Sequence, residues 1–377
     1  MSLAITYRGS GDPTEILEVT DVGPPHPPRP GQLQVQVSAF PIHPGDLLAI
    51  SASSALAGAQ IAGIEATGVV TEIGAGVSGF SPGSRVSFFP HSGAWREVVN
   101  IDAAIAVPVP DSVPDEVAAQ MLCNPITALM LRRAAQQHFG VGFDGVVLNN
   151  AAASSVGRLF TAIAERHNIA TVSIVRSERR AEQLRDRFPT VPVVSTSDPG
   201  WVAQVRTAAA GRPIPVALDP VGGTMAGDLL SALSPGGTLI SYGVLAQEPI
   251  PLRAAAVLQS ALGIRGLTIN RWLTAVSAEQ RASDVASAVM ITTSMSQHFD
   301  VAAVYPLDRI TDAVRHVSQP VDSARASMLL ASVTGGLPDP RCRASRHRSD
   351  QPRRCPEAAC RRFEGSFRHG RHGHRQG

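Results

Sequence analysis

One stretch of the sequence indicates the fold more clearly than any other: Asp144-Gly-Val-Val-Leu-Asn-Asn-Ala-Ala-Ala-Ser-Ser-Val-Gly157. A short apolar run, Val146 to Leu148, leads into small residues, and an amphipathic helix pattern follows. This order is typical of a dinucleotide-binding βαβ unit, in which small side chains let the backbone approach a pyrophosphate and the helix N–H groups stabilise its charge. Ala151, Ser154 and Gly157 stand where three glycines are usual. The turn alone therefore does not distinguish a cofactor site from an ordinary strand–helix turn.

The apolar runs that follow extend this unit into a nucleotide-binding sheet. Ile169 to Val175 predicts a second buried strand that ends at Arg176. An NAD site usually has an acid here that binds the ribose hydroxyls, whereas a cation suits the 2′-phosphate of NADPH. We therefore expect NADPH, with a solvated Arg176 or a ribose bound by Glu178 as the alternatives. Val216 to Gly223 and Gly237 to Gly243 predict two more strands that end in glycine-containing turns, as strands beside a cofactor do.

Length and composition fit an α/β enzyme with two domains. The chain has 377 residues, of which 44% are hydrophobic, so it can bury a substantial core. It has no apolar run of about 18 residues, which a membrane-spanning helix requires. The N-terminus lacks the basic and apolar regions of a signal peptide, so we expect a cytoplasmic protein with a small-molecule substrate and no membrane partner. All 33 basic residues are Arg, which excludes chemistry that needs a Lys amine.

Residues 336–377 differ sharply from the rest of the chain. They hold eleven of the 33 Arg against four acidic residues, together with three of the four Cys and four His. No zinc-finger spacing connects these Cys and His, and aliphatic residues are too few to bury a core. We predict a disordered tail, whose abrupt composition is typical of a C-terminus read out of frame. The remainder of the chain is net acidic, so nucleic acid is not an expected partner.

Hydrophobic patterning divides the rest of the chain. Gln32 to Ser38 alternates polar and apolar residues, as a half-buried strand does, and the first 110 residues predict a small, mostly β barrel-like domain. A helical stretch follows between Pro114 and His138, with Asp111 or Ser112 as candidate N-caps. From residue 144 to 269, six short apolar strands alternate with helices, which is the pattern of a doubly wound sheet.

Beyond Trp272 the pattern changes again. We expect a long helix from Ser277 to about Ser296, a strand from Val301 to Tyr305, a helix from Asp308 and a closing strand from Ala326 to Ala331. A nucleotide-binding domain inserted between two segments of a second domain explains this order. The predicted domains are residues 1–118 with 270–335, residues 119–269, and the tail 336–377.

Several phrases of the first domain together resemble the medium-chain dehydrogenase/reductase superfamily, and the resemblance extends over residues 1–331. Tyr7 to Leu17 is similar to its N-terminal hairpin, and Pro41-Ile-His-Pro-Gly-Asp46 resembles its I-N-P-x-D stretch. Gly63-Ile-Glu-Ala-Thr-Gly68 through Gly83-Ser-Arg-Val86 is similar to its G-x-E-x-x-G-x-V…G-D-R-V signature. The resemblance implies an α/β chain in which a doubly wound Rossmann domain is inserted into a GroES-like, mostly β catalytic domain.

Within the superfamily the chain resembles the zinc-free branch, first the mitochondrial-type 2-enoyl thioester reductases and then the ζ-crystallin-like quinone reductases. The resemblance implies NADPH as the cofactor and a homodimer that pairs through the strand Thr238 to Tyr242 and its neighbour. The matching phrases are Gly93-Ala-Trp-Arg96, Cys123-Asn-Pro-Ile-Thr127, the turn from Asn150 to Gly157, Ser241-Tyr-Gly243, and Ile264 to Trp272.

The resemblance also implies which residues contact the cofactor. Asn124 and Thr127 border the nicotinamide, and Arg176 binds the 2′-phosphate. We also expect Asp219, in the strand that begins at Val216, to bind the cofactor. Core packing is the alternative role for Tyr242 and Trp272. The pyrophosphate contacts are Ala153, Ser154, Ser155, Val156 and Gly157, and the residues that line the cofactor are Tyr242, Gly243, Leu267, Thr268 and Ile269.

The chain departs from this pattern where the reaction takes place. Enoyl thioester reductases of this branch carry a Tyr shortly after the I-N-P-x-D stretch, but Leu47 to Ser54 contains none. Hydride addition to the β-carbon makes the carbonyl oxygen enolate-like, so hydrogen-bond donors and a proton are needed there. Without the Tyr, Ser54 and His43 are the catalytic candidates, with Ser53 or water as alternatives.

Three functions therefore compete. The first is an NADPH-dependent reductase of an activated carbon–carbon double bond, most closely a 2-enoyl thioester. The second is a quinone or small enone reductase, which needs no dedicated acid because solvent can protonate the product. The third is an NADPH-binding protein with little turnover.

A zinc alcohol dehydrogenase is the remaining enzyme class. Its catalytic metal takes a Cys, a His and a second Cys, and by pattern those positions hold His43, Ile64 and Cys123. Because Ile64 cannot bind a metal, too few ligands remain for a three-ligand catalytic site, and we expect no metal. Cys123 has no evident His–Asp partner set and is interpreted as a small core residue rather than a nucleophile.

Overall fold

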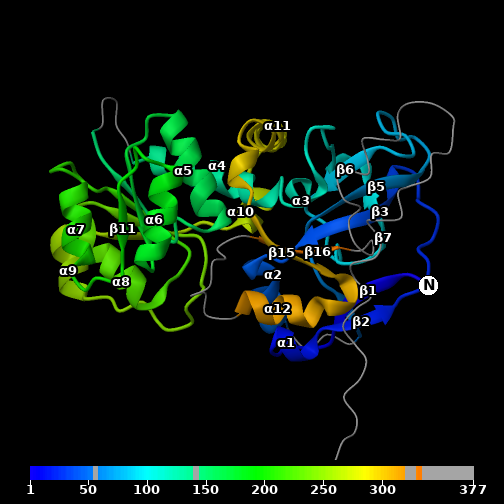
Figure 1. The fold of residues 1–377 in the computed structure, drawn as a ribbon, viewed down its shortest axis with the longest axis horizontal. Helices are drawn as coiled ribbons and strands as arrows, with labels where there is room; N and C mark the ends of the chain where they lie inside the picture. Colours follow the sequence, from blue (N-terminus) through cyan, green and yellow to red (C-terminus); the bar gives the residue numbers. More distant parts are fainter. Residues whose placement is uncertain (54–57, 139–143, 319–327, 333–377) are drawn as a thin grey trace, which may run out of the picture. The chain divides into compact units, whose positions relative to one another are not determined.

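Three β-sheets organise the computed structural model, which describes residues 1–53, 58–138, 144–318 and 328–332 (Figure 1). The six-stranded sheet is wholly parallel, in the order β11-β10-β9-β12-β13-β14. Strands β9 to β12 are short apolar runs that are buried along their whole length, as parallel strands between two layers of helices are. The six strands are β9 (Val147–Asn149), β10 (Thr171–Val175), β11 (Val193–Ser195), β12 (Val216–Asp219), β13 (Thr238–Ser241) and β14 (Gly263–Gly266).

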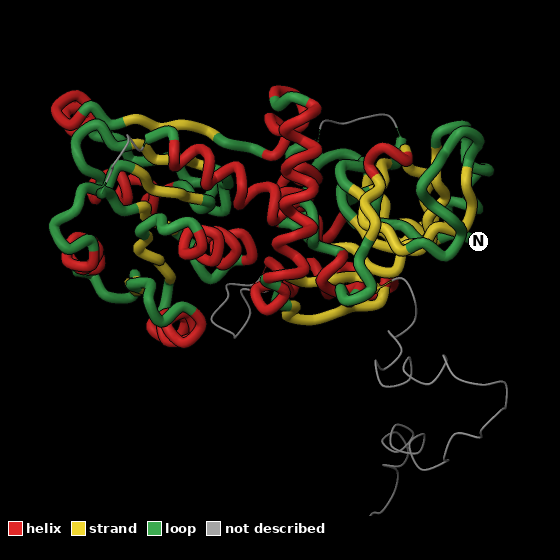
Figure 2. Tube along the Cα trace, turned by 90° about the horizontal axis from the view of Figure 1, so that it is seen from above, coloured by secondary structure: helices red, strands yellow, loops and turns green. Residues whose placement is uncertain are grey.

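Helices cover both faces of this sheet, because successive strand residues point to opposite sides. Val147 and Val175 pack with α4, α5 and α6 in one hydrophobic cluster, whereas Leu148 and Ile174 pack with α7 and α8 in another. The strand order reverses between β9 and β12, as in a Rossmann sheet, so the predicted doubly wound fold is confirmed. Figure 2 shows helices on either side of the strands in this part of the chain. The helices of this part are α4 (Cys123–Gln136), α5 (Ser155–Arg166), α6 (Glu178–Arg187), α7 (Trp201–Ala208), α8 (Gly223–Ala232) and α9 (Ala254–Ser260).

A seven-stranded, mostly antiparallel sheet forms around the long strand β3 (Gln32–Pro41), in which alternate residues are buried as predicted. β3 pairs with β5 and β7 of its own segment and with β16 of the C-terminal segment. The chain thus leaves this sheet for the parallel one and returns to it. Its other strands are β5 (Ala66–Ile73), β6 (Arg85–Phe88), β7 (Val98–Asp102), β8 (Ala106–Pro108), β15 (Val301–Pro306) and β16 (Met328–Ser332); the third sheet contains β1 (Leu3–Tyr7), β2 (Glu18–Asp21) and β4 (Gln60–Ile61).

The helical stretch expected between Pro114 and His138 is two helices, α3 (Asp115–Ala118) and α4. Pro114 is the N-cap of α3 and Leu122 that of α4, so the expectation that Asp111 or Ser112 caps this stretch is wrong. The second helix begins where a distant carboxylate binds its free N–H groups, a contact that no local pattern reveals. The other helices are α1 (Pro13–Ile16), α2 (Pro44–Ser51), α10 (Ile269–Ala275), α11 (Ala278–Ser294) and α12 (Ile310–Ser318), with single 3₁₀ turns at Ala103–Ile105, Ser296–His298 and Leu307–Arg309.

The strands of the parallel sheet lie between Val147 and Gly266, and those of the seven-stranded sheet lie on either side of them in the sequence. The exact domain boundaries stay a prediction. The predicted tail lies outside the described residues. None of the helices in the described ranges combines the length and the apolar composition needed to span a bilayer.

Candidate active site

The turn between β9 and α5 has the shape of an anion-binding site. Ser154 caps α5, since its side-chain oxygen accepts a hydrogen bond from the Gly157 N–H at 3.1 Å. A Cβ at Gly157 would lie 2.6 Å from the Ala151 carbonyl oxygen, so glycine lets the helix approach the turn this closely. The residues predicted at the pyrophosphate from Ala153 to Val156 are partly exposed. The first N–H groups of a helix attract negative charge, so this turn fits a pyrophosphate.

The ends of β9 and β12 meet where the strand order reverses, which is where doubly wound sheets bind ligands. Asp219 is fully buried there, and its carboxylate accepts hydrogen bonds from Asn150 Nδ2 at 2.7 Å, the Val221 N–H at 3.0 Å and the Gly222 N–H at 2.9 Å. Its oxygens are therefore used inside the protein. This geometry supports a role in holding the β12–α8 turn and does not support Asp219 as a direct cofactor contact.

The ends of β13 and β14 bring the remaining lining residues to the same edge of the sheet. A Cβ at Gly243 would lie 2.7 Å from the Pro220 carbonyl oxygen, so glycine permits a close approach of two turns. Burial and the nearby Asp219 raise the pKa of Tyr242, which therefore keeps its proton. The predicted segment Leu267–Ile269 follows β14 directly, with the Leu267 N–H bonded to Ser241 O at 2.8 Å. We call the carboxyl ends of β9, β10, β12, β13 and β14 the cofactor edge.

The end of β10 carries the predicted 2′-phosphate site. Arg176 directly follows the strand and is exposed. Burial and the charges of Arg179 and Arg176 lower the pKa of Arg180, so three cations lie near one another. Glu178, the alternative ribose ligand, is paired with Arg185 instead. This end of the cofactor edge is therefore positively charged.

The first turn of α4 carries the two residues predicted beside the nicotinamide. Asn124 is 5% exposed, and its Nδ2 has no hydrogen-bond partner within the described ranges. A buried amide without a partner is costly, so such a group is available to a ligand. Thr127 is partly buried, and its hydroxyl donates to Cys123 O at 2.8 Å.

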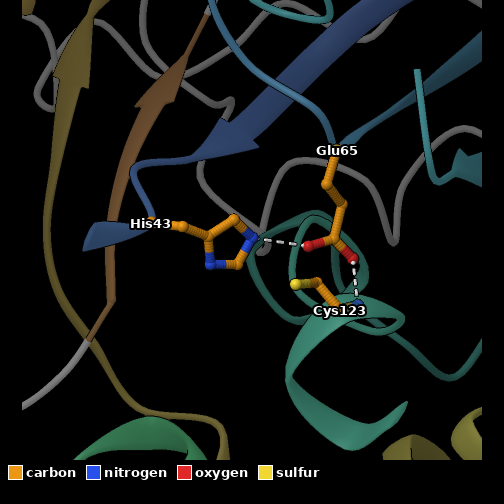
Figure 3. A group of neighbouring side chains, drawn as sticks. All are labelled: His43, Glu65 and Cys123. Carbon is orange, nitrogen blue, oxygen red and sulfur yellow. Dashed lines mark hydrogen bonds and ion pairs between the residues drawn. The ribbon is translucent and has the colours of Figure 1, made fainter. Parts of the chain in front are cut away.

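Glu65 connects three segments in a buried polar cluster (Figure 3). Its Oε2 lies 2.7 Å from His43 Nε2, and its Oε1 accepts hydrogen bonds from the N–H groups of Leu122 at 2.9 Å and Cys123 at 3.0 Å. Asp46 accepts a hydrogen bond from the His43 N–H at 3.2 Å. All four side chains are buried, and we call His43, Asp46, Glu65 and Cys123 the Glu65 cluster.

Burial and charge set the protonation of the Glu65 cluster. Burial lowers the pKa of His43, but the hydrogen bond and charge of Glu65, with Asp46, outweigh it and raise that pKa. Burial raises the pKa of Asp46 to about 6, against the opposing effect of His43. Burial also raises the pKa of the Cys123 thiol well above its usual range, and Glu65 and Asp46 act in the same direction. Cys123 is therefore a protonated thiol and not a thiolate nucleophile.

The Glu65 cluster corrects one premise of the sequence argument about metals. Ile64 is not a ligand, but the next residue, Glu65, supplies a third donor, so that ligand atoms of His43, Glu65 and Cys123 lie within 4.8 Å of one another. Both Glu65 oxygens already accept hydrogen bonds, and the thiol keeps its proton. A zinc ion would have to displace the His43 contact and ionise the thiol. Because the donors are engaged with one another in the metal-free protein, we expect no metal, and this stays a prediction.

Of the two catalytic candidates, His43 and Ser54, the structure describes only His43. His43 is placed in the Glu65 cluster with its Nε2 engaged, whereas Ser54 lies outside the described residues. The sequence analysis gave no role to Glu65 and Asp46, although both belong to the phrases that resemble the superfamily. A signal was present for Glu65: it directly precedes the buried strand β5, and a carboxylate in such a place needs partners.

Two family models match the chain. One, described as a zinc-binding dehydrogenase, matches residues 155–285. The other, described as an alcohol dehydrogenase GroES-like domain, matches residues 29–111. The first match lies over the parallel sheet and its helices and the second over the antiparallel sheet, so the predicted pair of a Rossmann domain and a GroES-like domain is confirmed.

Curated relatives include mitochondrial enoyl-[acyl-carrier-protein] reductases. The protein of Arabidopsis thaliana is 28% identical over 279 residues, which are 72% of this chain and 73% of that protein. The protein of Caenorhabditis elegans is 29% identical over 279 residues, which are 72% of this chain and 79% of that protein. The similarity therefore spans most of both chains.

Solved structures with the same fold include quinone reductases. A Bacillus thuringiensis protein assigned as an NADPH:quinone reductase superposes with a TM-score of 0.77 at 25% identity, over 88% of this chain and 98% of that chain. The quinone oxidoreductase of Escherichia coli, solved in complex with NADPH, has a TM-score of 0.74 at 22% identity, over 88% of this chain and 99% of that chain. At that identity the second likeness shows the fold alone.

Proposed function

The chain belongs to the medium-chain dehydrogenase/reductase superfamily, and we propose that it uses NADPH to reduce an activated carbon–carbon double bond, most closely that of a 2-enoyl thioester. Membership makes it an oxidoreductase that works with a nicotinamide cofactor. The observation that carries the finer proposal is the similarity to enoyl-[acyl-carrier-protein] reductases over 72% of the chain.

The choice of NADPH over NADH is supported by the charges at the end of β10. Arg176, Arg179 and Arg180 lie together there, and Glu178, which would bind a plain ribose, is paired with Arg185. A phosphate between arginines gains charge-assisted hydrogen bonds that a hydroxyl does not.

The residues of the cofactor edge fit a dinucleotide. The turn at Gly157 and the first N–H groups of α5 would hold the pyrophosphate, since a Cβ at Gly157 would fill that approach. The amide of Asn124 would serve the nicotinamide end, where it now lacks a partner in the described chain. Bound NADPH supplies a hydride. The part of the protein is to orient the two reactants, exclude water and stabilise the charge that develops on the carbonyl oxygen.

The described residues do not supply an evident hydrogen-bond donor to that carbonyl oxygen, as an enoyl reductase would require. The expected Tyr is absent from Leu47 to Ser54. His43 is buried with its Nε2 held by Glu65, so this geometry does not support it as the direct proton donor. Loss of one such donor typically costs about 10²–10³ in turnover. We therefore expect slow reduction of enoyl thioesters.

The missing donor favours a second candidate function, reduction of quinones or small reactive enones. These substrates need less stabilisation of a developing oxyanion, and solvent can protonate the product. The 25% identity to the Bacillus thuringiensis protein, over 88% of this chain, supports this candidate.

A homodimer is part of the proposal. β14 is the edge strand of the parallel sheet, and its Ile264 is 43% exposed, while Leu258 in the preceding helix α9 is 83% exposed. An edge strand with unpaired N–H and C=O groups pairs readily with a second copy. Light scattering on the purified protein tests this, and a monomer at micromolar concentration would contradict it.

The reaction is tested by single-enzyme assays with NADPH against crotonyl thioesters and a simple quinone. We expect both to be reduced, the quinone faster. Crotonyl thioester reduction that is as fast as quinone reduction would mean that an unrecognised donor is present. Tight NADPH binding with neither activity would contradict both candidates and favour a cofactor-binding protein with little turnover.

A further inference from the structure

The first turn of α4 has a cap that comes from far away in the sequence. Leu122, its N-cap residue, offers no side-chain hydrogen bond. The Leu122 and Cys123 N–H groups bond instead to Glu65, which precedes Leu122 by 57 residues. A carboxylate satisfies these free donors and also matches the positive end of the helix dipole. Because Glu65 is fully buried, its geometry is fixed by the surrounding protein rather than by solvent.

The second oxygen of Glu65 extends the contact to another helix. His43, which lies 2.7 Å away, is the N-cap residue of α2, and Asp46 in the first turn of α2 accepts from the His43 N–H. One carboxylate therefore links the starts of α2 and α4 (Figure 3). α2 begins the stretch in which the expected catalytic Tyr is missing.

The linked end of α4 also carries the residue proposed at the nicotinamide. Asn124, with its unpartnered Nδ2, follows Cys123 directly. α4 packs against α5, whose first turn forms the proposed pyrophosphate site. A shift of the first turn of α4 would therefore move the Asn124 amide relative to the cofactor edge.

We propose that Glu65 is a positioning residue for hydride transfer: its two oxygens fix the first turn of α4, and with it Asn124, against the segment that carries His43. This inference rests on the proposed function. Reactions between held groups depend steeply on geometry, and a displacement of about 1 Å can lower the rate about 10²-fold. Binding of the adenosine end, which would lie at the end of β10, should not depend on this contact.

The test compares Glu65→Ala with Glu65→Gln and with a matched control, Asp284→Asn. Gln keeps an oxygen that can accept the two N–H bonds, so it should rescue most of the function. Asp284 is also buried, but it bonds to Arg133 in the last turn of α4 and to Trp272, so its loss disturbs the same helix at the other end. Single-turnover hydride transfer to a quinone is measured together with the isotope effect from deuterated NADPH and the affinity for 2′,5′-ADP.

We expect Glu65→Ala to slow hydride transfer about 100-fold, with an increased isotope effect and with 2′,5′-ADP affinity unchanged within threefold. Glu65→Gln should remain within about tenfold of the wild type, and Asp284→Asn should lose thermal stability without a change in hydride transfer. The double variant Glu65→Ala/Asn124→Ala should be little slower than the slower single variant, because both act through one amide. If Glu65→Ala does not fold, the same comparison is made with Glu65→Gln, Asn124→Ala and their double variant. The double variant should then transfer hydride little more slowly than the slower of the two single variants.

Several results would overturn the inference. One is an unchanged rate of hydride transfer in folded Glu65→Ala. Another is a loss of hydride-transfer rate in Asp284→Asn as large as that in Glu65→Ala. A third is bound zinc that is present in the wild type and absent from the Glu65 variants. If the wild type transfers no hydride to any acceptor, the proposed function fails. Positioning is then read from the emission of bound NADPH, which reports the surroundings of the nicotinamide. Glu65→Ala should change that emission while keeping 2′,5′-ADP affinity, and an unchanged emission would overturn the inference separately.

Discussion

The cofactor edge and the Glu65 cluster are both polar sites, but their partners come from different distances along the chain. At the cofactor edge, Ser154 binds the N–H of Gly157 three residues later, and Asp219 binds the N–H groups of Val221 and Gly222. One contact of the edge is long-range, because Asp219 also binds the amide of Asn150, which lies 69 residues before it. In the Glu65 cluster, the partners of Glu65 lie 22 to 58 residues away. Most contacts of the first site lie within turns that contiguous residues can form, whereas the Glu65 cluster exists only after three segments have met.

This difference has a chemical consequence. The cofactor edge brings together the first N–H groups of α5 and, at the end of β10, a group of three arginines, so we expect this edge to serve binding. The Glu65 cluster closes its hydrogen bonds internally, so it holds structure rather than a ligand. The comparison predicts that changes at the edge alter affinity for NADPH, and that changes in the cluster alter geometry, protonation and stability.

The largest effect is expected at Gly157. Gly157→Ala places a Cβ 2.6 Å from Ala151 O and 2.7 Å from Ala152 Cα, so the turn must shift and misalign its N–H groups. Losing two charge-assisted hydrogen bonds of about 1.5–3 kcal/mol each weakens NADPH binding by at least about 100-fold. Fluorescence titration measures this. Gly45→Ala, where a Cβ meets nothing within 4 Å, is the control, and equal losses in the two variants would contradict the close-approach argument.

A smaller and more selective effect is expected at Arg176. Arg176→Ala removes a charge-assisted contact to the 2′-phosphate of about 1.5–3 kcal/mol, so NADPH binding should weaken by about tenfold or more. NADH binding should barely change, because its ribose has no phosphate. Titration with both cofactors distinguishes the two cases. Equal losses for NADPH and NADH would show that Arg176 is not the 2′-phosphate site.

The Glu65 cluster predicts that stability depends on pH. Asp46 has a folded pKa of about 6 against 3.8 in the unfolded chain, so the folded state holds a proton that the unfolded state has lost. The contribution of Asp46 to the free energy of unfolding should therefore fall as the pH rises from about 4 to about 6, by an amount on the order of 2 kcal/mol. The raised pKa of His43 acts in the same direction: its contribution is present below pH 6.5 and is lost as the pH rises through the folded pKa. The lowered pKa of His298, about 4, acts in the opposite direction over this range, so the contribution of Asp46 has to be measured as a difference between variants.

Asp46→Asn sharpens this test, because an amide oxygen can still accept the His43 N–H without burying a charge. Chemical denaturation at pH 5 and pH 7 should show that the free energy of unfolding of the wild type, relative to that of the variant, is lower at pH 7 than at pH 5. The same pH dependence in both proteins would contradict the assignment of the raised pKa of Asp46.

The smallest effect is expected from chelation. Because the donors of the Glu65 cluster are engaged with one another, purified protein should contain no stoichiometric zinc and should keep its activity after dialysis against a chelator. Metal analysis by mass spectrometry checks the first point. Loss of activity on chelation, restored by zinc, would show that the His43–Glu65 contact opens to admit a metal.

Much of the fold was predictable because its signals are local. The buried strands around Val147 and Val175, the turn before Gly157 and the alternation in β3 all follow from residues within a few positions of one another. The split between α3 and α4 was not predicted. It depends on Glu65, which supplies the cap that no residue near Leu122 provides.

Four features could be derived from the amino-acid sequence, because each is a property of a short stretch or of the order of stretches: the doubly wound sheet, the inserted order of the domains' strands, the small-residue turn and the cation at the end of β10. Three others appear only once the chain is folded: the internal hydrogen bonds of Asp219, the His43–Glu65 contact, and the third metal-type donor beside His43 and Cys123. Burial explains this division, because a buried carboxylate needs hydrogen-bond donors, and the residues next to it in the chain do not show which donors the fold will bring to it.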